Sequence, residues 1–135
     1  TRPWQHVLEA LSGYLILSYK LSLNKKLHGE VFNFGPNNRN NFSVLEVIKK
    51  IKKIWKKISW KITKKNELNY ESKLLKLNSN KAKKILKWKS ILTFEETIKL
   101  VASWYRNYYE NKKNFAEISS NQIKFYEKAF EKRFK

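Results

Sequence analysis

The segment from His6 to Leu23 most constrains how this chain can fold, because it predicts a helix with apolar residues on nearly every side. Val7, Leu11 and Leu15 recur at helical spacing, and other apolar side chains occupy the remaining sides. A helix of this kind requires burial on more than one face. We therefore expect it to belong to a layered structure and not to lie on a surface.

Downstream, the hydrophobic period alternates between two and 3.6, which predicts both strands and helices. The chain over residues 30–34 reads as a short strand that Gly35-Pro36 ends, and residues 58–63 read as a strand with one covered face. Capping boxes at Ser43–Glu46 and Thr93–Glu96 predict two helix starts. A short strand over 74–77 and helices over 80–86 and 121–134 complete the pattern. The order of these predicted helices and strands indicates an α/β fold with too few strands for a complete doubly wound sheet.

Residue types that are rare or missing exclude several kinds of chemistry. The 135 residues match the length of one ordinary domain, and they include no cysteine and only two histidines. Disulfides, thiolate nucleophiles and cysteine-ligated zinc are therefore excluded, and a histidine-rich metal cluster is not expected. No apolar run approaches the roughly 18 residues of a transmembrane helix. The 11 acidic residues show no pair spaced for acid–base catalysis.

The net charge of +19 comes mainly from lysine, with 26 Lys against four Arg. Proteins that read nucleic acids favour the planar fork of Arg. Lysine spread over the whole chain instead favours a compositional bias of the genome. The helix over 48–57 has an apolar stripe and a lysine face that would suit an anionic membrane or a phosphate backbone. Packing of the stripe on a sheet, with the lysines in solvent, is the favoured interpretation.

Three further features have two interpretations each. The aromatic residues are either stacking platforms for bases or core residues, and their place on apolar helix faces favours the core. His6 is either a ligand or base, or a structural residue at a helix start, and we favour the latter. Arg2 precedes a helix that should be buried, so its charge needs either a carboxylate or a ligand phosphate, and the composition leaves these alternatives open.

The opening residues, Arg2-Pro3-Trp4-Gln5-His6-Val7-Leu8-Glu9 followed by Leu11-Ser12-Gly13-Tyr14, closely resemble a stretch of the CDP-glucose 4,6-dehydratases. These enzymes belong to the extended short-chain dehydrogenase/reductase superfamily. Further segments resemble the family in order along nearly the whole chain. They are 32–36, 44–47, 70–72, 75–78, 81–82, 86–89, 104–105, and 121–123 with Tyr126. The opening motif is the specific part, and the remainder is shared with sugar-nucleotide epimerases and dehydratases generally.

The resemblance implies the C-terminal portion of a larger NAD-dependent lyase, and the chain also lacks Met and opens on Thr1. It implies that residues 1–35 form the last helix and strand of a Rossmann domain, residues 36–113 a substrate-binding subdomain and residues 114–135 a helical tail. The NAD loop and the catalytic Tyr-x-x-x-Lys motif lie upstream in such enzymes. No catalytic, cofactor-binding or metal-ligating residue is therefore expected here, and we expect apolar surface on residues 6–34 to be bare.

The resemblance also implies substrate-binding roles for Arg2, Gln5, Tyr70 and Glu71. Arg2 matches an Arg that contacts the diphosphate, and Glu71 matches a position near the nucleotide sugar or phosphate. Tyr70 stands where the family usually has His. The implied substrate is CDP-glucose, and the enzyme is expected to be a cytoplasmic homodimer in deoxysugar and surface polysaccharide synthesis, without nucleic-acid or membrane partners. The alternatives are another sugar-nucleotide enzyme of the superfamily, or a small basic protein that binds nucleic acid or a membrane surface.

Overall fold

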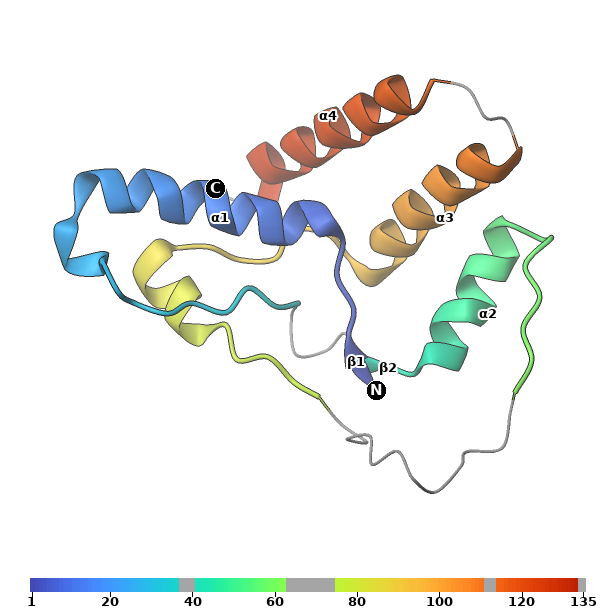
Figure 1. The fold of residues 1–135 in the computed structure, drawn as a ribbon, viewed down its shortest axis with the longest axis horizontal. Helices are drawn as coiled ribbons and strands as arrows, with labels where there is room; N and C mark the ends of the chain where they lie inside the picture. The colour runs from blue at the N-terminus through green and yellow to red at the C-terminus, as the bar shows by residue number, and fades with distance from the viewer. Residues whose placement is uncertain (37–40, 63–74, 111–113, 134–135) are drawn as a thin grey trace.

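The computed structural model describes residues 1–36, 41–62, 75–110 and 114–133, which are mostly helical (Figure 1). Four longer helices carry the structure, and the shorter elements connect them. In chain order the elements are β1 (Arg2–Pro3), α1 (Val7–Leu23), the 3-10 turn η1 (Lys25–Leu27), β2 (Asn41–Phe42), α2 (Val44–Ile54), the π-helical turn η2 (Ala82–Leu86), α3 (Phe94–Glu110) and α4 (Phe115–Arg133).

The expected α/β fold, with the last helix and strand of a Rossmann sheet, is wrong. Within the described ranges the strands are β1 and β2, two residues each, which pair antiparallel with Arg2 opposite Phe42. Residues 31–34 keep their period of two, since Phe32 and Phe34 turn inward while Val31 and Asn33 face solvent. They form no ladder, however, because a strand also needs a neighbour that takes up its backbone hydrogen bonds.

The predicted strand over 58–63 and the one over 74–77 are also not observed. Residues 58–62 show no regular strand. Of the side chains expected on the covered face, Ile58 is half-buried, whereas Trp60 is 37% and Ile62 76% exposed. Residues 75–77 are likewise irregular, while positions 63 and 74 lie outside the described ranges. Alternation of side chains predicts a strand only where a sheet exists to receive it.

The starts of α1, α2 and α3 were predicted well because they depend on local hydrogen bonds. His6 caps α1, and Ser43 and Glu46 form the expected capping box at α2. Thr93 Oγ1 accepts from the Glu96 amide at 3.1 Å, while Glu96 accepts from the Thr93 amide at 2.8 Å, which caps α3. The start of α4 at Phe115 is earlier than predicted. The preceding Asn114 has a φ of 55°, a left-handed conformation that Asn tolerates and that separates α4 from α3.

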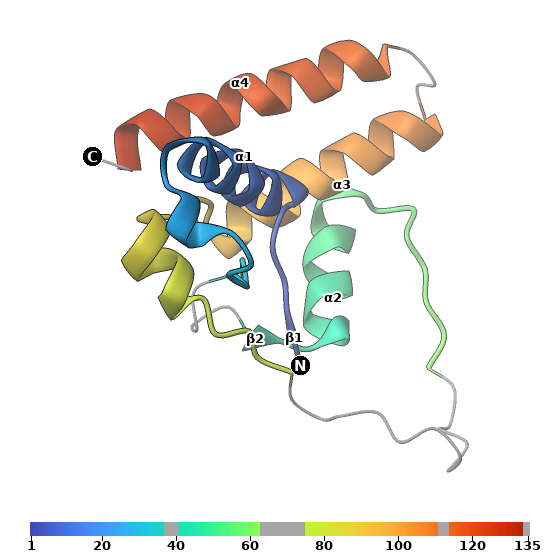
Figure 2. The same cartoon turned by 60° about the vertical axis from the view of Figure 1, so that its left-hand side comes forward.

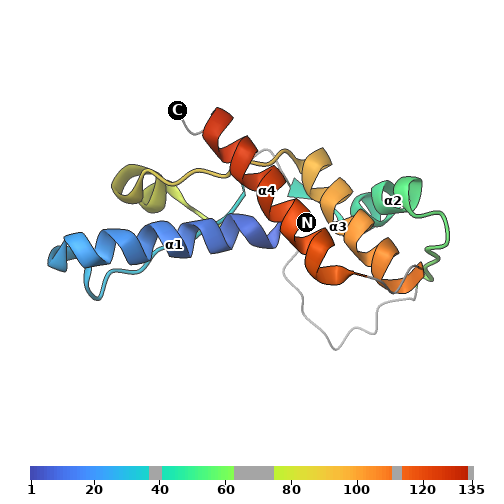
Figure 3. The same ribbon diagram turned by 90° about the horizontal axis from the view of Figure 1, so that it is seen from above.

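The helices pack as layers on one another and not on a sheet (Figure 2). The apolar stripe of α2, with Val47 and Ile51, contacts Phe94 and Ile98 of α3. The prediction that this stripe packs is therefore confirmed, but its partner is a helix. Helix α4 lies along α3 and crosses over α1 (Figure 3). A small core between them contains Ile91, Leu92 and Tyr126.

A second core joins the inner face of α1 to η2. Trp88 is fully buried, and its ring meets that of Phe34 edge-on with the centroids 5.1 Å apart. Phe34 lies directly over Gly13 of α1, where a Cβ atom would clash with the ring. Leu27, Ala82 and Leu86 complete the cluster. Ala82 and Leu86 point inward as predicted for the helix over 80–86, but Ile85, which was also expected to point inward, is 41% exposed.

The outer face of α1 is bare. Val7, Leu11 and Leu15 are 62%, 45% and 73% exposed, and Tyr14, Tyr19 and Leu23 continue this face toward the end of the helix. The prediction that residues 6–34 leave apolar surface uncovered is confirmed, although its strand is not formed.

Candidate functional site

The N-terminal segment, which carries the most specific motif in the sequence, runs from β1 into the first turn of α1. Its aromatic residue ties it to the β2 strand, because Trp4 Nε1 donates to the carbonyl oxygen of Phe42 at 2.8 Å. Arg2 lies in β1 and is half-buried, and its guanidinium donates to the Thr1 carbonyl oxygen at 3.0 Å. The pairing of β1 with β2 and the Trp4 hydrogen bond hold the segment against residues 41–42, whereas the Arg2 hydrogen bond stays within the segment.

Only one of the two polar atoms of the Gln5 side-chain amide forms a hydrogen bond with the described residues. Its Nε2 donates to the carbonyl oxygen of Phe34 at 2.9 Å, which fixes the extended segment 31–34 against the start of α1. Its Oε1 is buried and accepts no hydrogen bond from the described residues. A buried acceptor without a donor is costly, so Gln5 holds a polar atom whose hydrogen-bonding capacity is unused.

His6 is the titratable group at the start of α1. Its Nδ1 accepts from the Leu8 amide at 3.3 Å, so the neutral ring carries its proton on Nε2. The residue is only 4% exposed. Burial lowers its pKa, because the protonated ring would lose its hydration, and the side chain of Gln122 opposes this shift. His6 is therefore held as a neutral ring at pH 7, consistent with its predicted structural role.

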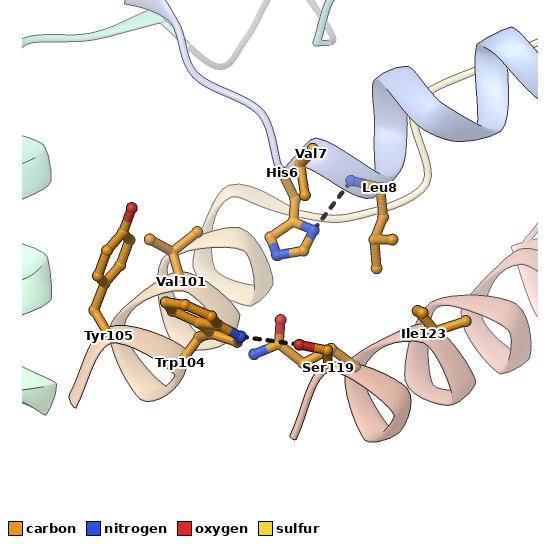
Figure 4. A pocket seen from close by; sticks show the side chains of 9 residues that line it. His6, Val7, Leu8, Val101, Trp104, Tyr105, Ser119 and Ile123 are labelled. Atoms are coloured by element: carbon orange, nitrogen blue, oxygen red, sulfur yellow. Dashed lines mark hydrogen bonds between the residues drawn. The ribbon is translucent and has the colours of Figure 1, made fainter. Parts of the chain in front are cut away.

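Next to His6 is a cavity of about 440 Å³ between the first turn of α1, the middle of α3 and the first half of α4 (Figure 4). The His6 ring points from α1 toward Trp104 of α3 and Ser119 of α4. Trp104 Nε1 donates to Ser119 Oγ at 3.1 Å, which joins the two helices across the cavity. The other lining residues are Val7, Leu8, Val101, Tyr105, Gln122 and Ile123.

The residues that line this cavity are suited to binding. No carboxylate of the described residues lines it, and its imidazole, His6, is neutral and engaged at the helix start. Gln122 Nε2 is committed to the Leu100 carbonyl oxygen at 2.8 Å. The apolar and aromatic walls suit an apolar or planar group. The meeting of His6 with Trp104 and Gln122 could not be predicted from the sequence, because the cap of α1 lies about 100 residues before α3 and α4 in the chain.

Glu9, which sequence analysis did not single out as functional, is the most connected buried side chain. It is 1% exposed and accepts hydrogen bonds from the amides of Ile91 at 2.9 Å and Leu92 at 2.6 Å, and from the Ser90 hydroxyl at 3.0 Å. Tyr126 of α4 also donates to it. The Glu9 carboxylate accepts the hydrogen bonds that the amides of Ile91 and Leu92 would otherwise lack. It thereby joins this segment to α1 and α4, so its role is structural.

The four predicted substrate-binding residues divide into two groups. Arg2 and Gln5 lie on one short segment, where Arg2 donates a hydrogen bond to Thr1 and Gln5 donates one to Phe34, and neither residue lines the His6 cavity. Tyr70 and Glu71 lie outside the described residues. The structure therefore leaves the four roles as predictions.

Two features of the sequence bear on cofactor binding. The chain has three glycines, of which Gly13 lies inside α1 beneath Phe34 and Gly35 lies against Leu77. They do not form the glycine-rich turn between strand and helix that holds a dinucleotide, so these residues do not fit NAD. The spacing Tyr-x-x-x-Lys, which sequence analysis overlooked, occurs at Tyr108–Lys112 and Tyr109–Lys113. Both lysines lie outside the described residues, and both tyrosines belong to a stacked aromatic cluster.

The described residues form neither a metal site nor a membrane-spanning helix. No three acidic or imidazole side chains of the described ranges gather in a way that would hold a metal ion. Each described helix also falls short of the length and apolar character that crossing a membrane requires.

Comparison with known proteins shows a sequence similarity to an enzyme. No model of a known protein family matches the sequence. A curated CDP-glucose 4,6-dehydratase from Salmonella typhimurium is 33% identical to it over 106 residues, which cover 78% of this chain. The matched part is 29% of the length of that enzyme, so the chain spans less than a third of its relative. The similarity supports a relation to the sugar-nucleotide dehydratases.

Proposed function

We propose that this chain is the substrate-binding portion of an NAD-dependent dehydratase that converts CDP-glucose to CDP-4-dehydro-6-deoxyglucose. The observation that carries the proposal is the 33% identity to a CDP-glucose 4,6-dehydratase over 78% of the chain. The motif around Arg2 and Gln5 adds support, because it is the part of the sequence most specific to this class of enzyme. The identity alone supports the broader class, and the motif is our reason for choosing CDP-glucose within it.

In this proposal the chain contributes binding energy and no bond-breaking group. Arg2 pairs with the diphosphate of the substrate, and Gln5, Tyr70 and Glu71 contact its nucleotide end. Interactions at the nucleotide position the distant sugar for reaction, so they assist turnover without touching the reacting carbons. NAD, when bound, accepts and returns a hydride, and it is held by a part of the enzyme outside this chain.

The proposed setting follows from the same relation. Residues 36–113 form the substrate-binding part, and the complete enzyme is a cytoplasmic homodimer that serves deoxysugar synthesis for surface polysaccharide such as O-antigen. In this proposal the enzyme has no nucleic-acid or membrane partner.

Binding measurements on the purified chain test the proposal. We expect CDP-glucose to shift amide resonances of the N-terminal segment in NMR spectra, and equal concentrations of UDP-glucose to shift them less. We also expect no turnover of CDP-glucose by the chain with added NAD, because its residues do not form a dinucleotide loop.

Two outcomes would contradict the proposal. Turnover by the pure chain would show that the chemistry resides here. Binding of single-stranded RNA or anionic vesicles, together with no response to any sugar nucleotide, would instead identify a basic binding protein.

A further inference from the structure

A groove of about 710 Å³ lies between α1 and α4. Figure 3 shows how α4 crosses α1. Its apolar lining is accessible to solvent in part, since Leu11 and Ile123 are each 45% exposed and Leu15 is 73% exposed. The groove continues onto the bare outer face of α1. Exposed apolar surface of this extent on a small protein marks a place where another molecule binds.

The spacing of the lining residues indicates the shape of what fits. Both helices present apolar side chains at steps of three and then four residues, which are Leu8, Leu11 and Leu15 on α1 and Ile123, Tyr126 and Phe130 on α4. Side chains at such steps form one ridge on a helix. Leu8 and Tyr126 are packed in the core where the two ridges meet, so they form the floor of the groove. The exposed Leu11, Leu15 and Ile123 stand along its sides, and a groove of this shape accommodates a third helix. The α1 ridge spans about two helical turns, so two to three turns of a partner helix would fill the groove.

The charged residues at the groove indicate which charge the partner helix should carry. Glu127 and Glu131 line it, lie one turn apart on α4 and are both exposed. Neither forms an ion pair or hydrogen bond with the described residues. In a chain with 30 basic and 11 acidic residues, two unpaired carboxylates beside an apolar groove are complementary to lysine or arginine.

We propose that the groove between α1 and α4 binds a basic amphipathic helix of a protein partner, with its apolar residues between the two ridges and its Lys or Arg residues facing Glu127 and Glu131. A second copy of this chain is a poorer occupant. The basic helix that it offers, α2, already packs Val47 and Ile51 against its own α3. An anionic membrane is also a poorer occupant, because the groove itself carries negative charge. The proposal goes beyond the proposed function.

A pair of synthetic helical peptides of about five turns tests this proposal with the full chain. The first carries Leu at steps of three and four with Lys in the flanking positions, and the second replaces each Lys by Glu. We expect the Lys peptide to bind in fluorescence anisotropy with a Kd of about 10–100 μM, and the Glu peptide to bind about tenfold more weakly. The double variant Glu127→Lys/Glu131→Lys should reverse this preference, as charges flanking an apolar seam select the partner.

Matched variants separate the groove from general effects. Leu15→Asp should abolish binding, whereas Ile62→Asp, at a residue that is 76% exposed and outside the groove, should not change it. Leu15 is exposed, so its substitution should leave the circular dichroism spectrum unchanged. The control Glu95→Lys/Glu117→Lys changes the net charge equally at residues that do not line the groove, and the peptide preference should remain.

Several results would overturn the proposal. The first is that neither peptide binds, and the second is that binding is indifferent to Leu15→Asp. The third is that Glu127→Lys/Glu131→Lys and Glu95→Lys/Glu117→Lys change the preference for the Lys peptide equally. The net charge of the chain, and not the groove, would then decide which peptide binds. Concentration-dependent dimerisation that Leu15→Asp abolishes would assign the groove to a second copy. Tighter binding to anionic vesicles that the same variant abolishes would assign it to a membrane.

Discussion

The hydroxyl of Tyr126 in α4 donates a hydrogen bond of 2.9 Å to Glu9 Oε2 in α1, across 117 positions of sequence. Both residues are buried, and the same hydroxyl lies 2.9 Å from Ser12 Oγ. Burial and the nearby Glu9 carboxylate raise the pKa of Tyr126, so its hydroxyl stays protonated and able to donate. This contact fixes where α4 crosses α1 and therefore shapes the groove between them.

Removing that hydroxyl should destabilise the fold. Tyr126→Phe takes one donor from a buried carboxylate, and we expect the free energy of unfolding to fall by about 2 kcal/mol. Urea denaturation measures the change. Tyr105→Phe is the control, because Tyr105 is 48% exposed and its change should stay within about 0.5 kcal/mol. Equal effects of the two variants would mean that the hydrogen bond to Glu9 is not stabilising.

A second prediction concerns the close packing of Phe34 on α1. Gly13→Ala places a methyl group inside the position of the Phe34 ring, and that ring is held by Trp88. Although Ala favours helices more than Gly does, we expect a loss of about 1–3 kcal/mol from the displaced ring. Gly13→Ala combined with Phe34→Leu should recover part of this loss in thermal unfolding. A stabilised single variant would contradict the close contact.

Acid sensitivity should arise partly from the ion pair between α3 and α4. Two nitrogens of Arg133 contact the two oxygens of Glu96 at 2.7 Å and 2.8 Å, and this pairing lowers the pKa of Glu96 from 4.5 to about 2. Because the folded-state pKa is lowered, the stabilisation is complete above pH 4.5 and is lost as the pH falls from 4.5 toward 2. The Glu96 side chain is 23% exposed and that of Arg133 39%, so solvent screening limits the contribution to about 1–2 kcal/mol.

The variant Glu96→Gln tests this pH dependence. Its stability should be lower than that of the natural sequence at pH 6, and the difference should shrink as the pH falls toward 3. Unfolding in urea at several pH values measures it, with Glu127→Gln as an exposed control. A difference that stays constant with pH would show that Glu96 acts as a helix cap and not through its charge.

The proposed phosphate role of Arg2 gives a binding prediction. Arg2→Ala should weaken the binding of CDP-glucose by about 2–4 kcal/mol in a complete enzyme, because a guanidinium makes charge-assisted hydrogen bonds to a diphosphate. Lys52→Ala, on the exposed face of α2, should change it by a few tenths of a kcal/mol at most. Glu71→Ala should have an intermediate effect. Steady-state kinetics of the three variants measure this, and equal effects of Arg2→Ala and Lys52→Ala would exclude the phosphate role.

The sequence by itself determined the helices and where most of them begin. His6, Ser43 and Thr93 lie within a few residues of the amides that they cap, so each start could be predicted from a short window. It also determined that α1 is apolar on more than one side, and the structure shows one side packed on Trp88 and another bare. These features depend on local geometry, which a single sequence contains.

Only the tertiary structure decided what those helices contact. Residues 31–34 keep an alternating pattern but have no strand beside them among the described residues, and α2 packs on α3 instead of a sheet. The role of Glu9 depends on amides 82 and 83 positions away and on Tyr126 beyond them. The cavity at His6 and the groove at Glu127 likewise combine residues from separate helices. Contacts between distant segments depend on how the whole chain packs, which no periodicity within one segment can specify.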